Sequence, residues 1–443
     1  MDIRSLVEQN SWWKDAMLIE QDYDIQRWKQ HAHLWIPDIV KKITLKPFAL
    51  HIISGPRQAG KTTALKLLIK TLLEQGKNPK SLFYFNCENV ADSKELEDVL
   101  RTYKEFQELN GVKESIIILD EITLPKEWFR TIKFLIDTGT LKYDVVILTG
   151  SSSITIKRQV ELFPGRRGNG NDYTLHPLSF RAFLRVLQPE LEKRIPLIDN
   201  PLIVGNKVAE LLPYEKELTR HLLTYFDYGG FPLAVASIDK DKEEAKRTYL
   251  SWIKNAILKA DRSDIIARQI IKVLVESTPT DISWEGIARK IEVKSPKTVA
   301  SYIDLLTSLF VINVLYNIDI STKKLRFAKN KKIHFRDPLL LEILEDWCLV
   351  PATNKTATLA ESVLVEHLSR AFPGNVHFWK DSYEIDAIVL EKNNIHGFEM
   401  KWSEHAEAKI PHNLTTCTIL TKKEYSKKPS KIPLSLFLSM LDV

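Results

Sequence analysis

The sequence is poor in the residue types that mark several classes of protein. Its 443 residues include only three cysteines, Cys87, Cys348 and Cys417, which lie far apart in the chain. This excludes a cysteine-rich zinc site and a disulfide framework, and it is typical of a reducing compartment. None of the eleven histidines has the spacing of a metal site. The apolar runs are too short to span a bilayer, and the N-terminus lacks the apolar stretch of a signal peptide. We therefore expect a cytoplasmic protein with no part in a membrane.

Glycine is also scarce, with fifteen residues in the chain. Eight of them fall in the segments 55–60, 165–170 and 229–230 and at Gly150. Because glycine lets the backbone come close to a ligand, these places are candidates for a binding site. The composition, 44% hydrophobic and 27% charged, is that of a globular protein, and its length suits roughly two to four domains. A net charge of +6 permits binding of nucleic acid without requiring it.

Residues 55–62 match the phosphate-binding loop GxxxxGK[ST]. An expected strand at 49–53 precedes this loop, and an expected helix at 63–74 follows it. The predicted nucleotide-binding residues are Gly55, Pro56, Arg57, Gln58, Ala59, Gly60, Lys61, Thr62 and Thr63. Backbone N–H groups and the helix N-terminus favour phosphate oxygens. We expect Lys61 to act on the β- and γ-phosphates and Thr62 to bind Mg²⁺, so ATP and Mg²⁺ are the predicted cofactors.

Five short apolar runs alternate with helical patterns, which predicts an α/β fold with a parallel sheet covered on both faces. The expected strands are 49–53, 82–85, 116–119, 145–148 and 173–175. The third is followed by Asp120 and Glu121, a Walker B pattern. We expect Asp120 to hold Mg²⁺ through water and Glu121 to polarise the attacking water, although acidic pairs also follow strands without such a role. An extra strand between the two motifs favours the class that includes AAA+ proteins over a kinase or a GTPase.

Two weaker features lie further along the chain. Ser151, after the fourth strand, is our candidate for a hydroxyl that senses the γ-phosphate, and Thr149 is the alternative; a turn that caps the next helix would explain the same serines. Arg166 is our candidate for an arginine finger, acting in the same chain or on a neighbouring subunit of a homo-oligomer. Arg167 is nearly as suitable, and a solvated basic turn would leave the same pattern.

Residues 262–336 predict a winged helix. Helices are expected at 264–276, from Trp284 onward, and after Ser295, where Ser at the N-cap precedes Pro at the first helical position. Strands are expected at 310–316 and 325–335. In DNA-binding winged helices the third helix enters the major groove. The residues expected on its outward face are Lys297, Thr298, Ser301 and Tyr302.

A run of seven cations supports contact between this segment and DNA phosphates. The seven residues are Lys323, Lys324, Arg326, Lys329, Lys331, Lys332 and Arg336. Charge runs are, however, usually solvated faces, and winged helices also bind proteins. DNA is therefore the predicted partner of this segment, and a protein contact is the alternative.

Residues 337–443 contain the pattern of a PD-(D/E)xK nuclease. A helix with Glu361 precedes expected strands, of which one begins near Asp386 and another carries Glu399 and Lys401. Residues two apart on a strand share a face, so Glu399 and Lys401 point together. We expect Glu361, Asp386 and Glu399 to bind Mg²⁺, and Lys401 to orient a water, or to lower its pKa, for attack on a phosphodiester. Such domains also occur as inactive binding modules.

Together these motifs resemble a prokaryotic, archaeal-type family of AAA+/STAND-like P-loop ATPases with a C-terminal restriction-endonuclease-like domain. The motifs are GPRQAGKTT, ILDE, LTGSSS, the glycine–arginine loop, HPLSF and YGGFP. The resemblance implies that Pro232 of YGGFP contacts the nucleotide from a helical lid; a turn between helices is the alternative. The expected parts are an N-terminal helical extension (1–44), a P-loop core (45–180), a helical lid (181–261), a winged helix (262–336) and a nuclease-like domain (337–443).

Two functions of different classes fit this organisation. In the first, ATP hydrolysis acts on DNA and regulates the nuclease-like domain. In the second, ATP binding drives a STAND-type signalling or assembly switch, whose C-terminal domain recognises a partner. A metabolic kinase fits less well, because the sequence shows no acceptor site for a small substrate.

Overall fold

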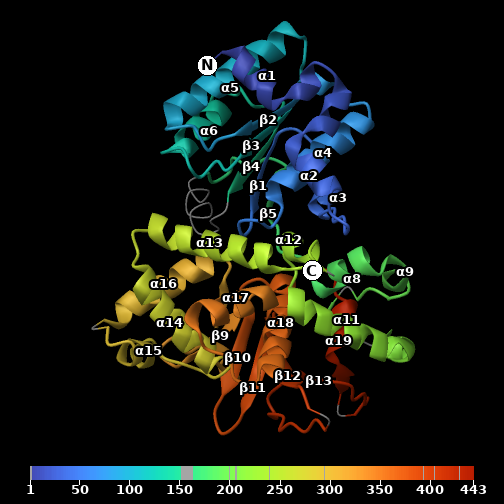
Figure 1. Cartoon of the computed structure of the whole chain (residues 1–443), viewed down its shortest axis with the longest axis vertical. Helices are drawn as coiled ribbons and strands as arrows, with labels where there is room; N and C mark the ends of the chain where they lie inside the picture. The colour runs from blue at the N-terminus through green and yellow to red at the C-terminus, as the bar shows by residue number, and fades with distance from the viewer. Residues whose placement is uncertain are drawn as a thin grey trace. The chain divides into compact units, whose positions relative to one another are not determined.

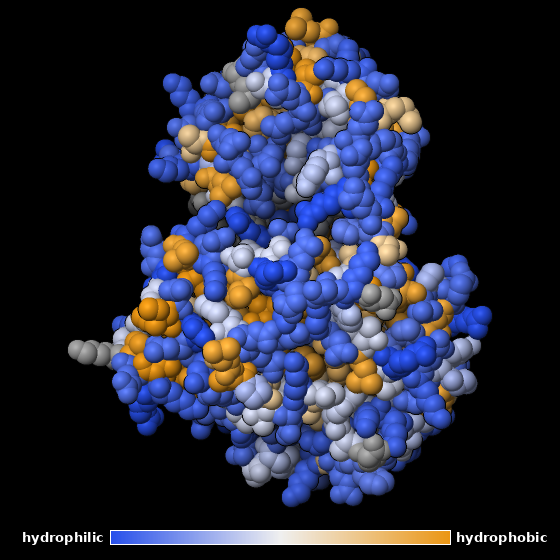
Figure 2. Space-filling view, in the orientation of Figure 1, coloured by the Kyte–Doolittle hydropathy of each residue, from blue (hydrophilic) through white to orange (hydrophobic). Residues whose placement is uncertain are grey.

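The computed structural model describes residues 2–150, 163–198, 200–204, 207–238, 240–293, 295–392, 394–403, 405–428 and 430–443. The chain forms two compact units, Met1–His176 and Pro177–Val443 (Figure 1). In the view of Figure 2, hydrophilic side chains cover most of the visible face of each unit. Among the described helices, none combines the length and the apolar character needed to cross a membrane. The five finer parts expected from the sequence remain a prediction.

The first unit is built on a parallel five-stranded sheet. Its strands are β1 (Ala49–Ser54), β2 (Leu82–Asn86), β3 (Ile116–Asp120), β4 (Val145–Gly150) and β5 (Asp172–Thr174). They lie in the order β2-β3-β4-β1-β5, and every pairing is parallel. This confirms the five predicted strands and the P-loop fold. Because β4 lies between β1 and β3, the two nucleotide-binding motifs are on strands that are not adjacent.

Helices cover both faces of this sheet (Figure 1). On one side lies α4 (Lys61–Glu74) with α2 (Tyr23–Lys29) and α3 (Ile39–Lys42). On the other side lie α5 (Ser93–Leu109) and α6 (Trp128–Asp137). Strands β1, β3 and β4 are buried along their whole length, which explains why they appear in the sequence as continuous apolar runs.

The N-terminal extension packs against the edge strand β2. It contains α1 (Ile3–Gln9), two 3-10 turns (Ser11–Trp13 and Ala16–Gln21), α2 and α3. The Asn10 amide donates to the Tyr84 carbonyl at 2.9 Å and accepts from the Tyr84 N–H at 2.7 Å. The indole N–H groups of Trp12 and Trp13 both donate to the Leu82 carbonyl, each at 2.9 Å. These residues therefore belong to the core of the first unit.

The second unit begins with a group of helices in the region expected to form a lid. They are α8 (Phe180–Leu187), α9 (Pro189–Glu192), α10 (Lys207–Leu211), a 3-10 turn (Leu212–Tyr214), α11 (Glu215–Tyr228), α12 (Pro232–Val235) and α13 (Glu243–Lys259). Ser179 caps α8 by accepting a hydrogen bond from the Ala182 N–H. The backbone N–H of Phe180 donates to Nε2 of His367 at 2.9 Å, which ties these helices to the C-terminal part of the same unit.

Three helices and an antiparallel strand pair follow in the order predicted for residues 262–336. They are α14 (Asp264–Ser277), α15 (Trp284–Lys290), α16 (Pro296–Ser308), β6 (Ile312–Tyr316), the short pair β7 (Ile318–Asp319) and β8 (Lys324–Leu325), and β9 (Lys331–Phe335). The second long strand begins at Lys331, six residues later than expected from the sequence, because β7 and β8 form a separate hairpin. Tyr302 of α16 is 3% exposed, and its hydroxyl accepts from the Ser263 N–H. The expectation that Tyr302 faces outward is therefore wrong.

The rest of the second unit is a mixed sheet with helices against it. Helix α17 (Pro338–Cys348) leads to α18 (Lys355–Ala371) and then to β10 (Val376–Lys380), β11 (Glu384–Glu391), β12 (Asn394–Lys401), β13 (Thr416–Thr421), β14 (Lys431–Pro433) and α19 (Leu434–Ser439). Strands β10 to β12 are antiparallel, whereas β13 and β14 run parallel to β12. Helix α18 is buried along most of its length and brings Glu361 close to β11.

Candidate functional sites

The phosphate-binding loop connects β1 to α4 and has the backbone conformation that phosphate binding requires. Gly60 has a φ of 89°, in the left-handed region that favours glycine. A Cβ at Gly55 would lie 2.3 Å from the Leu175 carbonyl oxygen, so no larger residue fits there. Lys61 is 5% exposed, and its Nζ donates to the carbonyl oxygens of Gly55 and Pro56, both at 3.0 Å. Burial lowers the pKa of Lys61. The loop and its lysine thus suit the phosphates of ATP.

Asp120 joins the residues predicted to handle Mg²⁺. Its Oδ2 accepts from the Thr62 hydroxyl at 2.6 Å and from the Tyr84 hydroxyl at 3.0 Å. Its Oδ1 accepts from the Thr149 hydroxyl and, at 3.1 Å, from the Glu121 N–H. The side chains of Thr62 and Asp120 supply the oxygen ligands that Mg²⁺ prefers, so the residues present fit a Mg²⁺–ATP site.

The sequence pattern missed Tyr84, which lies on β2 and contacts Asp120 from the neighbouring strand. Burial, followed by the charge of Asp120, raises the pKa of Tyr84. Glu121 follows Asp120 with a φ of 51°, and its N–H also approaches the Thr149 hydroxyl at 3.1 Å. Thr149, the alternative sensor, is therefore in contact with the Walker B pair. Ser151, the first choice, lies outside the described residues.

The glycine–arginine loop lies along β1 and is held by hydrogen bonds. The Arg167 carbonyl accepts from the Leu50 N–H at 3.0 Å. A Cβ at Gly168 would lie 2.3 Å from the Phe48 carbonyl oxygen, so this glycine is explained by close packing. Arg166 forms an ion pair with Asp137 of α6, with Nε 2.6 Å from Oδ1, and Arg167 forms one with Asp172. The role of Arg166 as an arginine finger remains a prediction.

The YGGFP motif is a turn between α11 and α12 in the second unit. Gly229 has a φ of 69°, and a Cβ there would lie 2.0 Å from Oδ1 of Asp337. The Gly230 N–H donates to Oδ2 of Asp337 at 2.8 Å, and burial raises the pKa of this carboxyl to about 6. Pro232 is the first residue of α12. The two glycines thus accommodate Asp337, which the sequence pattern did not reveal, and nucleotide contact by Pro232 remains a prediction.

The predicted nuclease-like residues lie on adjacent strands. Glu399 of β12 accepts from the Asp386 N–H of β11 at 3.2 Å, and Asp386 accepts from the Met400 N–H at 2.8 Å. Lys401 forms an ion pair with Glu399 on the same face of β12. Burial, followed by the charge of Asp386, raises the pKa of Glu399 to about 7. Asp386, Glu399 and Lys401 therefore form one cluster, as the spacing predicted.

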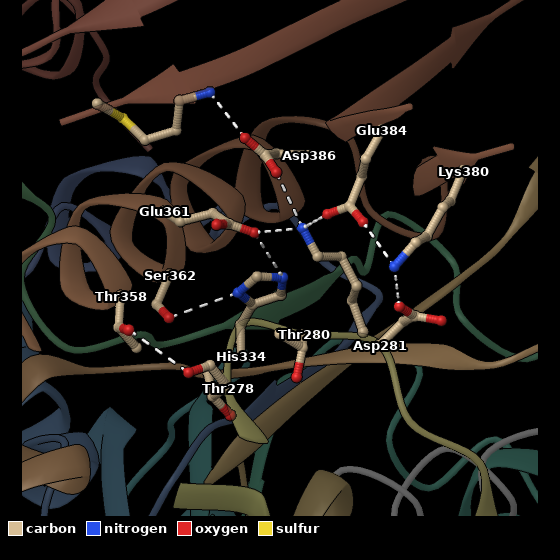
Figure 3. Close-up of polar contacts among 12 residues, drawn as sticks. Thr278, Thr280, Asp281, His334, Thr358, Glu361, Ser362, Lys380, Glu384 and Asp386 are labelled. Atoms are coloured by element: carbon tan, nitrogen blue, oxygen red, sulfur yellow. Dashed lines mark hydrogen bonds and ion pairs between the residues drawn. The ribbon is translucent and has the colours of Figure 1, made fainter. Parts of the chain in front are cut away.

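Glu361 of α18 joins this cluster through a lysine that was assigned to the DNA-binding run. Lys332 of β9 is 1% exposed, and its Nζ lies 2.6 Å from Oε1 of Glu361 and 2.9 Å from Oδ1 of Asp386. It also forms an ion pair with Glu384. We call Lys332, Glu361, Glu384 and Asp386 the lysine–carboxylate cluster. Figure 3 shows its three carboxylates converging from α18 and β11.

The charges in this cluster alter one another's protonation. Burial would lower the pKa of Lys332, but Asp386, Glu361 and Glu384 raise it well above its usual value. Burial would raise the pKa of Asp386, but Lys332 and the Met400 N–H lower it. Burial and the charge of Asp386 raise the pKa of Glu361 to about 8. In this arrangement, no group of three or more acidic, histidine or cysteine side chains in the described part of the chain is placed to hold a metal ion.

Fewer of the seven cations can contact DNA phosphates than the sequence suggested. Lys332 is buried in the lysine–carboxylate cluster, so its assignment to a solvent-facing DNA contact is wrong. Lys331 is 8% exposed and lies over the Trp284 ring, and Arg336 forms an ion pair with Glu366. Arg326 is paired with Asp319. The remaining cations, Lys323, Lys324 and Lys329, are exposed. β9 thus directs part of its positive charge into the unit.

Comparisons with known proteins cover both units. Residues 48–184 match the model of a family described as an AAA domain. Residues 219–347 and 357–433 match two families described as domains of unknown function. An uncharacterized protein of Methanocaldococcus jannaschii is 24% identical over 332 residues, which cover 71% of this chain and 64% of that protein. The chain thus spans less than two thirds of the length of this relative.

Other similarities extend over most of the chain at low identity. An uncharacterized protein of Haemophilus influenzae is 24% identical over 364 residues, 78% of this chain and 80% of that protein. The solved structure of the Aeropyrum pernix ORC2 protein has a TM-score of 0.39 and 14% identity, and the match covers 76% of this chain and 93% of that one. A Walker-type ATPase of Pyrococcus abyssi has a TM-score of 0.38 and 12% identity, with coverage of 67% and 91%. The family match and the geometry of the loop show that residues 48–184 form a P-loop domain similar to the AAA family.

Proposed function

We propose that this protein couples ATP hydrolysis in its AAA domain to an action on DNA by its second unit. The observation that carries the proposal is the meeting of Asp386, Glu399 and Lys401 on β11 and β12, in a chain that also has a P-loop ATPase domain. The mixed order of β10 to β14, with α18 against the sheet, also supports a nuclease-like domain.

In the AAA domain, each residue of the loop has a distinct task. The backbone of residues 55–60 and the Lys61 ammonium bind and orient the phosphates. Thr62 and Asp120 would hold Mg²⁺, which would offset the charge that develops on the phosphates. Glu121 orients the attacking water and accepts its proton, while Thr149 keeps Asp120 in place through its hydroxyl. Ser151, Arg166 and Pro232 are proposed to complete the site in the nucleotide-bound state.

In the nuclease-like domain, the carboxylates of Asp386 and Glu399 are proposed to hold Mg²⁺ next to a DNA phosphate. The ion would supply Lewis-acid activation of the phosphate. Lys401 orients the attacking water. DNA would approach through α16 and the exposed Lys323, Lys324 and Lys329, which neutralise phosphates.

A second candidate is a nucleotide-dependent switch whose second unit binds a partner without cleaving it. The lysine–carboxylate cluster favours this alternative, because Lys332 already compensates charges that a catalytic metal ion needs. In that case the protein turns over ATP slowly and changes its association state when it binds ATP. A homo-oligomer is compatible with either function.

The test is hydrolysis of ATP with Mg²⁺ in the absence and presence of linear, branched and single-stranded DNA. Each reaction is also scored for DNA cleavage, and Lys61→Ala serves as the control for hydrolysis. The proposal expects hydrolysis to rise severalfold with at least one DNA. If no DNA changes the rate and none binds to the protein, action on DNA is wrong and the switch is favoured.

A further inference from the structure

The three carboxylates of the lysine–carboxylate cluster are arranged around a cation, and this cation is the ammonium group of Lys332. Glu361 comes from α18, Glu384 and Asp386 come from β11, and their carboxylates point toward one another (Figure 3). Lys332 comes from β9 and places its Nζ within 2.9 Å of Oδ1 of Asp386 and 2.6 Å of Oε1 of Glu361. Ca²⁺ binds oxygen ligands at roughly 2.3–2.6 Å, only a few tenths of an ångström closer. The oxygens must therefore draw closer by a few tenths of an ångström before they can hold a metal ion, in line with the lack of a ready-made metal site among the described residues.

A buried histidine beside the cluster is a second and independent observation. His334 lies two residues after Lys332 on β9, so both side chains leave the strand on the same face. His334 is 1% exposed, and its Nε2 makes no hydrogen bond. This nitrogen lies 3.8 Å from Oε1 of Glu361, whereas Nδ1 lies 3.5 Å from the Ser362 hydroxyl. Other buried histidine nitrogens of the described residues also lack a hydrogen bond, for example Nδ1 of His377 and Nε2 of His396, but that of His334 faces a carboxylate of the cluster.

The charge balance and the access route also suit an incoming ion. Three carboxylates surround the Lys332 ammonium, and two further lysines are paired at the edge of the cluster, Lys380 with Glu384 and Asp281 and Lys401 with Glu399. A pocket of about 250 Å³ extends to Glu361 and is lined by Thr278, Thr280 and Thr358, among others. The pocket thus reaches one carboxylate of the cluster, Glu361, along a lining that mixes threonines with Met400 and Trp402.

We propose that Lys332 is a displaceable internal cation that occupies a divalent metal site formed by Glu361, Asp386 and His334. The site accepts a metal ion only after the Lys332 ammonium has left it. The inference rests on the proposed function, because Asp386 is also assigned there to the nuclease-like site. It adds His334 as a ligand. Because Lys332 lies on β9, a shift of this strand would decide whether the site can bind a metal ion. Mn²⁺ is the probe ion, because carboxylate oxygens suit it and they form most of the site.

The experiment is isothermal titration of the full chain with Mn²⁺, without nucleotide. Lys332→Met is expected to bind Mn²⁺ at least about tenfold more tightly than the wild type, because the competing cation is gone. Lys331→Met is the matched control: it removes the adjacent lysine, which lies over the Trp284 ring, and is expected to behave as the wild type. Adding Asp386→Asn or His334→Ala to Lys332→Met is expected to abolish the gain, which separates this site from the ATP site.

Each other outcome is decisive. Equal Mn²⁺ affinity of the wild type and Lys332→Met overturns the inference, as does a gain that survives Asp386→Asn. Lys332→Gln is the second variant if Lys332→Met is poorly folded by circular dichroism. Failure of both variants to fold also overturns it, because Lys332 is then an indispensable structural cation. If Lys332→Met binds Mn²⁺ but cuts no DNA, the inference stands and the proposed nuclease activity is wrong.

Discussion

The two candidate sites each contain a buried lysine held by the protein itself, but the partners of the two lysines differ. Lys61 donates to two neutral backbone carbonyls, whereas Lys332 is surrounded by three carboxylates. Hydrogen bonds to neutral acceptors are weaker than those to charged groups. A phosphate can therefore take Lys61 from the loop at little cost, while Lys332 is held in its cluster by charged partners and must leave before a metal ion enters. Lys61 is thus available to bind a phosphate, whereas Lys332 occupies the position proposed for a metal ion.

The largest expected effect concerns Lys61. In Lys61→Ala, the loss of a buried charge contact to the phosphates should lower kcat/KM for ATP hydrolysis by about a thousandfold, or about 4 kcal/mol. Lys332→Met should hydrolyse ATP at the wild-type rate. A phosphate-release assay on both variants checks this contrast. Comparable losses in the two variants would show that the lysines do not have separate roles.

The next effect concerns stability. Asp386→Asn leaves Lys332 buried with one fewer charged partner, and we expect the free energy of unfolding of the second unit to fall by about 3 kcal/mol. Urea titration followed by circular dichroism and fluorescence measures it. Asp137→Asn is the control, since it breaks only the exposed ion pair with Arg166 and should leave the urea midpoint nearly unchanged. An equal shift of the urea midpoint in both variants would show that the buried ion pairs of Lys332 contribute no more to stability than an exposed ion pair.

Acid is expected to act on the second unit through His367. Its Nε2 accepts from the Phe180 N–H, its Nδ1 lies 2.7 Å from the Val363 carbonyl oxygen, and burial lowers its pKa to about 3. Between this value and the usual value of 6.5 the unfolded state binds more protons, so stability is present above pH 6.5 and is lost as the pH falls. From pH 6.5 to pH 5 the loss from this group is about 2 kcal/mol.

His367→Gln removes this titration. The variant should be less stable at pH 7.5 but should lose less stability than the wild type on acidification to pH 5. Thermal unfolding at several pH values tests the difference in slope. Parallel curves for the two proteins would rule out His367 as the source of acid sensitivity.

The smallest effect is expected at Tyr84. In Tyr84→Phe, Asp120 loses one of its hydrogen bonds but keeps those from Thr62, Thr149 and the Glu121 N–H. We expect ATP hydrolysis to fall by about fivefold, or about 1 kcal/mol. Thr149→Val removes the other hydroxyl and is expected to have a larger effect, because Thr149 contacts both Asp120 and Glu121. The reverse order in steady-state rates would contradict the alternative assignment of Thr149 as the sensor.

The sequence predicted what depends on local pattern. Continuous apolar runs predicted strands β1 to β4 of the first sheet, and the two-residue period placed Glu399 and Lys401 on one face. The sequence could not show that Lys332 is buried among carboxylates, because its partners Glu361 and Asp386 are 29 and 54 positions away. A lysine in a basic run has the same local pattern whether it is solvated or buried. Tyr302, Tyr84 and Asp337 were missed for the same reason: their roles are set by residues distant in sequence.

The hydrogen bonds along β2 have a further consequence. Its outward-facing backbone groups at Leu82, Tyr84 and Asn86 are already bonded to the side chains of Trp12, Trp13, Asn10 and Gln9. An exposed edge strand invites another chain to extend the sheet, which leads to aggregation. Here the amide and indole groups of the N-terminal extension mimic a neighbouring strand without offering an edge of their own. Removal of residues 1–44 would therefore make the first unit prone to aggregate, because the backbone groups at the β2 edge of the sheet would be left unpaired.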